Sequence, residues 1–558
     1  MGNNISYSVT PTTLDLGSQG SLNGLSYDNK VKRFLNIPFA LPPTGPYRWR
    51  KPRPLPSDFH YGDARDCTKF GPLAPQPGKY TSLGNSDEPE EEKLKYDEDC
   101  LTLNVWMPAG EPPQGGWPVV LWYHGGWMQV GDASVDPNMD PTELISSTGA
   151  ALQCVFIASA YRLSALGFLA SSELAAEAVS LGEENFWGNY GLWDQRLALD
   201  WVHENVGKWF GGNTREKLTL AGRSAGAYSV HAQVCHEFFM RKDEQKEDAP
   251  MFNRLIMYSN AIPTSPKSLS DVQPQFEELL TACSIPLSLS GPEKLARLRS
   301  IPARELTSKV MGLKMHTFRP VLDGAFFPTD LFDRFKNGDF AKEFERRRLE
   351  LLIGEVRDEE TIYRQTNPPD SLETLHLQVS NYYPSHVTDK LIDAYLTRKV
   401  HLPYAHPDPD PNIDAWKKVY GDIISDGQVR APSRLLIDQL RNANVPLSRV
   451  HRYLISYRPS FMDRVAPVTL GVGHAFDKPI WNFSIMHGPT DEEEKAMRAW
   501  IADLREFVNR GLSEETGGKG YGTKEWEEYK VLAEDGKIEV RKDAKWAYLL
   551  EVGEIMAV

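Results

Sequence analysis

Cysteine is scarce in this sequence, and metal-binding spacings are missing. Five cysteines are spread over 558 residues, which is too few for a disulfide scaffold. No CxxC or HExxH pattern occurs, so we expect no metal site.

Long hydrophobic runs are also missing. A helix that spans a bilayer needs about 18–20 apolar residues, whereas the longest candidates, around Val119–Tyr123 and Cys154–Ala160, have the length of buried strands. The opening residues MGNNISYSVT show neither the basic region nor the apolar core of a signal peptide. We therefore expect no transmembrane segment, while removal of a leader stays open.

Basic residues are fewer than acidic ones. The 62 basic and 76 acidic side chains give a net charge of −14, which repels phosphate backbones and argues against nucleic-acid binding. A hydrophobic fraction of 41% allows a large core. Composition says nothing of the oligomeric state.

Apolar, β-rich runs alternate with helix-like stretches. The predicted strands are Pro118–Tyr123, Val155–Ala160, Leu218–Ala221, Arg254–Ser259, Leu349–Ile353 and Arg452–Tyr457. Between them, Asp194–Val206 has apolar residues near helical spacing. The alternation predicts an α/β fold in which helices cover both faces of a mostly parallel sheet.

The chain shows no internal repeat and no convincing linker. We therefore predict a single domain over residues 1–558. Pro72–Asp99, rich in Pro, Gly and acidic residues, and the proline-rich Pro403–Pro411 are predicted insertions.

The sharpest motif is G-x-S-x-G at Gly222–Gly226. It follows the strand-like LTLA segment and precedes a potentially helical stretch, Ala227–Cys235. This order is typical of a nucleophile elbow, where a serine sits on a strained strand-to-helix turn. We predict that Ser224 is a nucleophile.

A second loop motif, His124-Gly125-Gly126-Trp127, follows the apolar run PVVLWY. Glycines after a strand leave backbone N–H groups unobstructed, as the oxyanion of an acyl-transfer reaction requires. The amide that follows the nucleophile, that of Ala225, belongs to the same predicted set of donors.

A serine nucleophile requires a histidine base and an orienting carboxylate. Among the histidines after Ser224, His474 lies in a glycine-flanked loop that can present an imidazole, but spacing alone does not select it. The acid is equally open, because Asp358, Glu359 and Glu360 are adjacent.

At this point the sequence resembles the type-B carboxylesterase/lipase family, which includes cholinesterases and fungal esterases. The resemblance rests on segments spread over the first half of the chain, and it thins beyond residue 240. These segments are IPFALPPTGPYRWRKPRPL, EDCLTLNVW, VVLWYHGGW, YRLSALGFLA and NYGLWDQRLALDWVHENVGKWFGGN.

The resemblance implies an α/β-hydrolase fold with a loop insertion at 67–100 and a divergent helical region at about 265–450. It implies a triad of Ser224, Glu359 and His474, and oxyanion donors at Gly126, Trp127 and Ala225. The EDCL motif implies a disulfide between Cys67 and Cys100, and a pair between Glu98 and Arg48. A disulfide would indicate an oxidising compartment, whereas a native N-terminus without a signal would indicate the cytoplasm, so localisation stays open.

The sequence departs from the family pattern in three places. Trp127 replaces the usual third glycine, so we expect its indole to narrow the acyl side of a pocket near Gly125. Arg223 replaces the glutamate that commonly precedes the nucleophile; it either favours anionic substrates or pairs with a nearby acid. The 67–100 loop contains no tryptophan, which argues against cholinesterase activity.

The function that this pattern predicts is hydrolysis of small to medium soluble esters through an acyl-enzyme, without metal or organic cofactor. The polar composition of the 67–100 loop argues against an interfacial lipase lid. Two alternatives keep part of the pattern: an acyltransferase or lactone-forming enzyme with the same triad, and a non-catalytic, cholinesterase-like interaction protein.

Overall fold

A large twisted sheet runs through the molecule. The computed structural model describes residues 7–77, 95–133, 139–146, 152–183, 185–241, 251–397, 415–485, 488–509 and 521–557. The sheet has 13 strands in the order β1-β2-β3-β7-β9-β8-β10-β11-β12-β13-β14-β15, with β6 paired to β2.

The middle of the sheet is parallel, from β9 to β14. Its strands are β9 (Val155–Ser159), β8 (Val119–Tyr123), β10 (Leu218–Arg223), β11 (Arg254–Tyr258), β12 (Glu350–Val356), β13 (Val450–Ile455) and β14 (Glu528–Leu532). Six of these correspond to the predicted strands. The predicted α/β-hydrolase fold with a mostly parallel sheet is confirmed.

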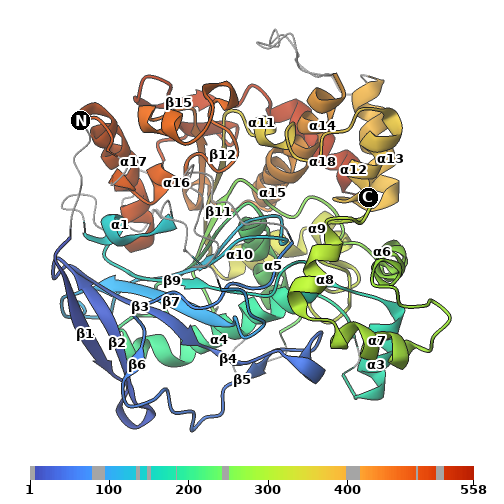
Figure 1. Ribbon diagram of the computed structural model, residues 1–558. Coiled ribbons are helices and arrows are strands. Elements are labelled where there is room, and N and C mark those ends of the chain that lie inside the picture. Colours follow the sequence, from blue (N-terminus) through green and yellow to red (C-terminus); the bar gives the residue numbers. More distant parts are fainter. Residues whose placement is uncertain are drawn as a thin grey trace.

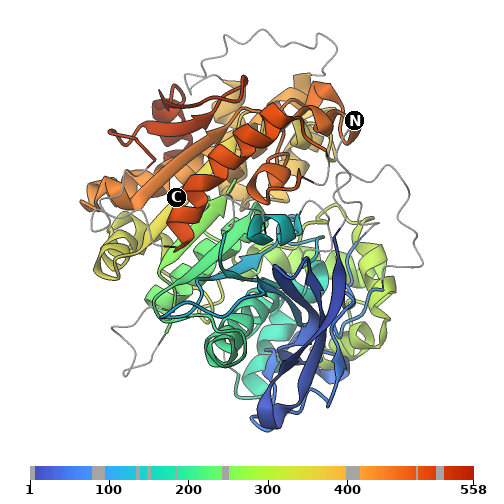
Figure 2. The ribbon, with the colours of Figure 1, turned by 90° about the vertical axis from the view of Figure 1, so that its left-hand side faces the viewer.

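Antiparallel strands flank the parallel part at both ends. At one end lie β1 (Val9–Asp15), β2 (Ser21–Tyr27), β3 (Val31–Pro38), β6 (Arg65–Asp66) and β7 (Thr102–Pro108), and at the other β15 (Ile538–Lys542). A separate short pair joins β4 (Ala40–Leu41) and β5 (Arg53–Pro54). Figure 2 shows the blue N-terminal strands and the orange-red C-terminal segments at opposite ends of the molecule.

Two apolar layers cover the parallel strands. Along β11, Leu255 and Met257 join one core cluster, whereas Ile256 and Tyr258 join the other. This alternation follows from the two-residue period of a strand. Helices α4 (Tyr190–Trp209) and α5 (Ala225–Phe239) pack on the first face, and α17 (Asp491–Asn509) packs on the second (Figure 1).

Helices fill the region between β11 and β13. They are α6 (Leu269–Ala282), α7 (Gly291–Ser300), α8 (Ala303–Val310), α9 (Leu331–Lys336), α10 (Asp339–Arg346), α11 (Glu360–Tyr363), α12 (Leu372–Ser380), α13 (Ser385–Leu396), α14 (Ala415–Ser425) and α15 (Ala431–Asn442). A π-helical turn, η4 (Asp426–Arg430), joins the last two. Helices α12, α13 and α14 gather beside α18 (Trp546–Met556) around a third core cluster (Figure 1).

The remaining helices are short. They are α1 (Thr142–Ser146), α2 (Ser164–Phe168), α3 (Ser172–Ser180) and α16 (Lys478–Trp481). Within the described ranges, no helix is long and apolar enough to cross a membrane. The predicted loop Pro403–Pro411 and residues 78–94 of the predicted Pro72–Asp99 loop lie outside the described residues.

Candidate active site

Ser224 lies between the carboxyl end of β10 and the first residue of α5. Its φ of 55° and ψ of −125° are rare for a residue with a side chain. The turn requires glycine on both sides: a Cβ on Gly222 would lie 2.3 Å from the backbone of Gly226, and one on Gly226 would lie 2.0 Å from the oxygen of Tyr123. The Ser224 amide donates to the Tyr258 oxygen over 2.7 Å, which anchors the turn to β11.

The His124–Trp127 loop packs directly on this turn. A Cβ on Gly125 would lie 2.6 Å from the oxygen of Arg223 and 3.1 Å from Cβ of Ser224. Gly126 has a φ of 110°, and a Cβ there would lie 2.0 Å from the oxygen of Val130. Both predicted glycines are therefore needed for close approach of backbone to backbone.

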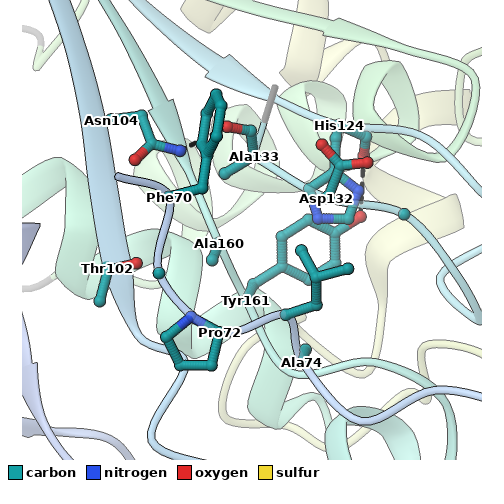
Figure 3. Close-up of a pocket in the computed structure, with 13 residues that line it drawn as sticks. Phe70, Pro72, Ala74, Thr102, Asn104, His124, Asp132, Ala133, Ala160 and Tyr161 are labelled. Atoms are coloured by element: carbon teal, nitrogen blue, oxygen red, sulfur yellow. Dashed lines mark hydrogen bonds between the residues drawn. The ribbon is translucent and has the colours of Figure 1, made fainter. Parts of the chain in front are cut away.

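The His124 side chain packs beneath this loop against Tyr161. Its ring lies against that of Tyr161 (Figure 3), and the two ring centroids are 4.3 Å apart. Burial lowers the pKa of His124 to about 4, so the imidazole is neutral at pH 7. The two rings border a cavity of about 20 Å³. Such a cavity has room for about one water molecule, so it is too small for an ester.

Three backbone amides of the turn and the neighbouring loop have no hydrogen-bond acceptor among the described residues. In the part of the chain that the structure describes, the N–H groups of Gly126, Trp127 and Ala225 donate no hydrogen bond. Ala225 is also the first residue of α5, where the helix dipole adds partial positive charge. The Trp127 indole turns away to pack edge-on against Tyr363, with centroids 6.4 Å apart.

His474 and Glu359 are in contact. Nδ1 of the buried imidazole lies 2.5 Å from Oε2 of Glu359, whose side chain is fully buried. Oε1 of the same carboxylate accepts hydrogen bonds from the Ser259 hydroxyl at 2.7 Å and the Val356 amide at 2.9 Å. The carboxylate is thus held by three donors, as a buried charge requires.

The two neighbouring carboxylates have other partners. Asp358 accepts from the Val472 amide at 2.7 Å and from Arg357 at 2.9 Å. Glu360 accepts from Arg430 at 2.6 Å. Burial raises the pKa of Glu360, but the Arg430 charge outweighs it and lowers the pKa to about 2. Of the three candidate acids, Glu359 is the one hydrogen-bonded to the imidazole.

The histidine loop is joined to both other parts of the site. The Asp358 amide donates to the Val472 oxygen at 3.0 Å, and the Thr361 hydroxyl donates to the Leu470 oxygen at 2.9 Å. On the other side, Arg223 forms an ion pair with Asp477. Nε2 of His474 is buried and has no hydrogen-bond partner, and the structure gives no hydrogen bond between it and the Ser224 hydroxyl.

Comparison with known proteins identifies the family. The family described as "Carboxylesterase family" matches residues 11–546. The chain belongs to this family. It is therefore a carboxylic ester hydrolase, and the resemblance found in the sequence is confirmed.

Relatives match this carboxylesterase over its whole length. An uncharacterized esterase/lipase of Schizosaccharomyces pombe is 38% identical over 98% of this chain and 97% of its own. A carboxylic ester hydrolase of Gibberella moniliformis is 37% identical over 97% and 95%. The crystal structure of Aspergillus niger EstA has a TM-score of 0.73 at 22% identity and covers 98% of this chain and 99% of its own, which shows the same fold.

The Arg223 side chain is buried in this carboxylesterase. The side chain is 2% exposed, pairs with the fully buried Asp477, and lies 5.0 Å from the centre of the Tyr258 ring. The structure therefore shows the alternative in which Arg223 pairs with a nearby acid, and binding of an anionic substrate by Arg223 stays a prediction. Asp477 itself was not predicted, because nothing in the local sequence links it to Arg223.

The predicted disulfide also needs correction. Cys67 and Cys100 are both free thiols and both fully buried in the first core cluster. Burial raises the pKa of each thiol, that of Cys67 to about 12, so both are protonated and behave as small apolar side chains. The other part of the motif is confirmed, because Arg48 forms a two-bonded pair with Glu98 at 2.8 and 2.5 Å.

Proposed function

We propose that the protein hydrolyses small to medium soluble esters through a triad of Ser224, His474 and Glu359. The observation that carries this proposal is the contact between Nδ1 of His474 and the buried carboxylate of Glu359. That contact fixes the ring so that Nε2 is its one unpartnered nitrogen. The elbow of Ser224, joined to the histidine loop by the Arg223–Asp477 pair, supports Ser224 as the nucleophile.

In the first half of the reaction, Oγ of Ser224 attacks the ester carbonyl while Nε2 of His474 accepts its proton. The Nδ1 proton stays on the imidazole, because Glu359 accepts a hydrogen bond from it and stabilises the imidazolium that forms. The alcohol then leaves with the proton from Nε2, and an acyl-enzyme remains on Ser224.

The three unpartnered amides supply the oxyanion site in this proposal. Gly126, Trp127 and Ala225 present N–H groups that satisfy nothing else in the described chain. Donors that are already oriented need no rearrangement when negative charge develops on the carbonyl oxygen, and loss of one such donor slows catalysis by about 10²–10³-fold.

In the second half, His474 accepts a proton from water, and the resulting hydroxide attacks the acyl-enzyme. The same amides bind the second oxyanion, and the acid leaves as Ser224 regains its proton. Each proton moves through Nε2 of His474, so no other side chain is needed for the proton transfers.

A fluorophosphonate probe and a p-nitrophenyl ester series test the proposal. We expect the probe to label the protein stoichiometrically and Ser224→Ala to remove labelling, with kcat lowered by about 10⁶-fold. Ser229→Ala, one turn further along α5, is the matched control and retains labelling. Undiminished turnover by Ser224→Ala would refute the triad. Adding a competing alcohol and analysing the products separates hydrolysis from acyl transfer.

A further inference from the structure

Arg319 is a buried arginine that has no ion-pair partner among the described residues. Its side chain is 8% exposed and lies between two aromatic rings, 5.8 Å from the centre of Tyr228 and 5.6 Å from that of Tyr382. Nη2 donates to Oε1 of Gln428, in the π-helical turn η4, over 2.8 Å. Within the described residues, no carboxylate lies at ion-pair distance from it.

Four other buried arginines of this molecule form ion pairs. Arg162, Arg223, Arg430 and Arg434 are buried to a similar degree, and each contacts at least one carboxylate. A buried charge is normally neutralised in this way, because desolvation is costly. For Arg319 the neutral amide of Gln428 occupies one N–H, and the remaining donors of the fork have no partner in the described chain.

The position of Arg319 is beside the active site. Tyr228 lies one turn after Ser224 on α5, and its amide donates to the Ser224 oxygen at 3.0 Å. The preceding residue, Phe318, exchanges two hydrogen bonds with the Gln129 side chain, at 3.1 and 2.6 Å. Gln129 also donates to the Trp127 oxygen at 3.1 Å, so the Phe318–Arg319 segment is fastened to the oxyanion loop.

The described groups around Arg319 are a lysine, an amide and several tyrosines, and the two carboxylates of the neighbourhood, Glu359 and Asp426, are hydrogen-bonded to other residues. Lys267 lies close to Arg319: burial and, second, the Arg319 charge lower the pKa of Lys267 to about 7, and the Asp271 charge opposes them with a smaller effect. Nζ of Lys267 donates to the Ser380 oxygen at 2.7 Å. Tyrosines supply most of the other walls: Tyr228, Tyr363, Tyr382 and Tyr383. A positive charge in such surroundings attracts an anionic group.

We propose that Arg319 binds a carboxylate of the substrate and thereby selects esters that carry a second, ionised carboxyl group. Monoesters of dicarboxylic acids and esters of hydroxy- or phenolic acids are of this class. A guanidinium presents two parallel N–H donors to a carboxylate, which is the contact that the unpartnered side of the fork can make. This inference rests on the proposed function, since it concerns the substrate of the same site.

Two matched substrate pairs test it. p-Nitrophenyl hydrogen glutarate and its neutral amide, p-nitrophenyl glutaramate, differ in charge on the acyl side. 4-Acetoxybenzoate and 4-acetoxybenzamide differ in the same way on the alcohol side. We expect wild-type kcat/KM to be higher for the anionic member of at least one pair by about tenfold, which corresponds to one charge-assisted contact.

Arg319→Gln is expected to abolish this preference, measured as the ratio of kcat/KM for the anionic ester to kcat/KM for its neutral partner. Arg319→Lys keeps the charge but loses the fork, so it retains part of the preference. The matched control is Arg254→Gln: Arg254 is also 8% exposed but lies at the opposite end of β11 from Tyr258, so the ratio of anionic to neutral kcat/KM stays at the wild-type value.

A wild-type ratio near one in both pairs, or a ratio unchanged in Arg319→Gln, would overturn the inference. If Arg319→Gln does not fold, competition by glutarate against neutral ester turnover in the wild type decides: stronger inhibition than by glutaramide supports the inference, and equal inhibition refutes it. Failure of the proposed function would look different, because Ser224→Ala would then still hydrolyse the neutral esters.

Discussion

In the proposed site, the part around the nucleophile Ser224 is held mainly by backbone contacts, whereas the part around the base His474 is held mainly by side chains. At Ser224 the elbow and the oxyanion loop meet through glycines at which an added Cβ would lie only 2.0–2.6 Å from neighbouring backbone atoms. At His474 the loop is held by the pairs of Asp358 with the Val472 amide and of Asp477 with Arg223, and by Glu359. The part around Ser224 depends on close backbone contacts, and the part around His474 depends on charged side chains. We therefore expect substitutions in the two parts to have different effects.

The largest effect is expected at Glu359, in the part of the site that depends on charged side chains. Glu359→Gln replaces the acceptor of Nδ1 by an amide that also offers an N–H, so the imidazole is no longer held in the productive tautomer. We expect kcat to fall by about 10⁴-fold, measured with p-nitrophenyl butyrate in single-turnover experiments. Glu360→Gln, which changes the adjacent carboxylate without touching the imidazole, has little effect on kcat. Equal losses in both variants would contradict the assignment.

The ion pair behind the site is expected to affect stability as well as rate. Asp477→Asn leaves Arg223 buried without a counter-charge, which lowers the free energy of unfolding by about 3–5 kcal/mol. Urea denaturation measures the loss. The control is Asp463→Asn, because the Arg458–Asp463 pair has a carboxylate side chain that is 48% exposed and is worth about 0–1 kcal/mol. A loss as small as that of the control would show that the pair does not hold the two loops together.

Gly126 tests the part of the site that depends on close backbone contacts. A Cβ at this position would lie 2.0 Å from the Val130 oxygen, so Gly126→Ala displaces the amide and lowers kcat by about 10²–10³-fold. Gly182→Ala is a close control, because Gly182 also has a positive φ but no atom lies within 4 Å of its Cβ position. If both variants keep wild-type kcat, the oxyanion site is not made by this loop.

The smallest effect is a dependence of stability on pH. Because Arg430 lowers the pKa of Glu360 to about 2, the unfolded chain binds a proton there first as the pH falls. The stabilisation is therefore fully present above the unfolded pKa of about 4.3 and is lost as the pH falls toward 2, by about 2–3 kcal/mol in total. Urea titrations between pH 5 and about 2.5 are expected to show a shallower fall for Glu360→Gln than for the wild type, while exposed Glu373→Gln follows the wild type.

The same difference explains what could be predicted from the sequence. Gly222, Gly226, Gly125 and Gly126 are required by local contacts, so short motifs next to apolar strands were enough to indicate the elbow and the loop. The contact of His474 with Glu359 joins residues 115 positions apart, and spacing could not choose this pair among ten histidines and three acids. The choice of His474 and Glu359 came from the resemblance to a known family.

Some features of the fold could be predicted and others could not. Six of the seven parallel strands were predicted because they are mostly buried and rich in apolar residues, whereas β14, in which only Val531 and Leu532 are buried, was missed. The terminal strands were missed because β1 and β15 are mostly exposed and carry no such run. The predicted disulfide failed for another reason: a motif shared with relatives does not determine whether two buried thiols are joined.

The ion pair of Arg223 and Asp477 connects residues 254 positions apart. The residues of the elbow are therefore synthesised long before the segment that carries His474 and Asp477. In the proposed mechanism, Ser224 therefore lacks its base until this late segment has packed against the elbow.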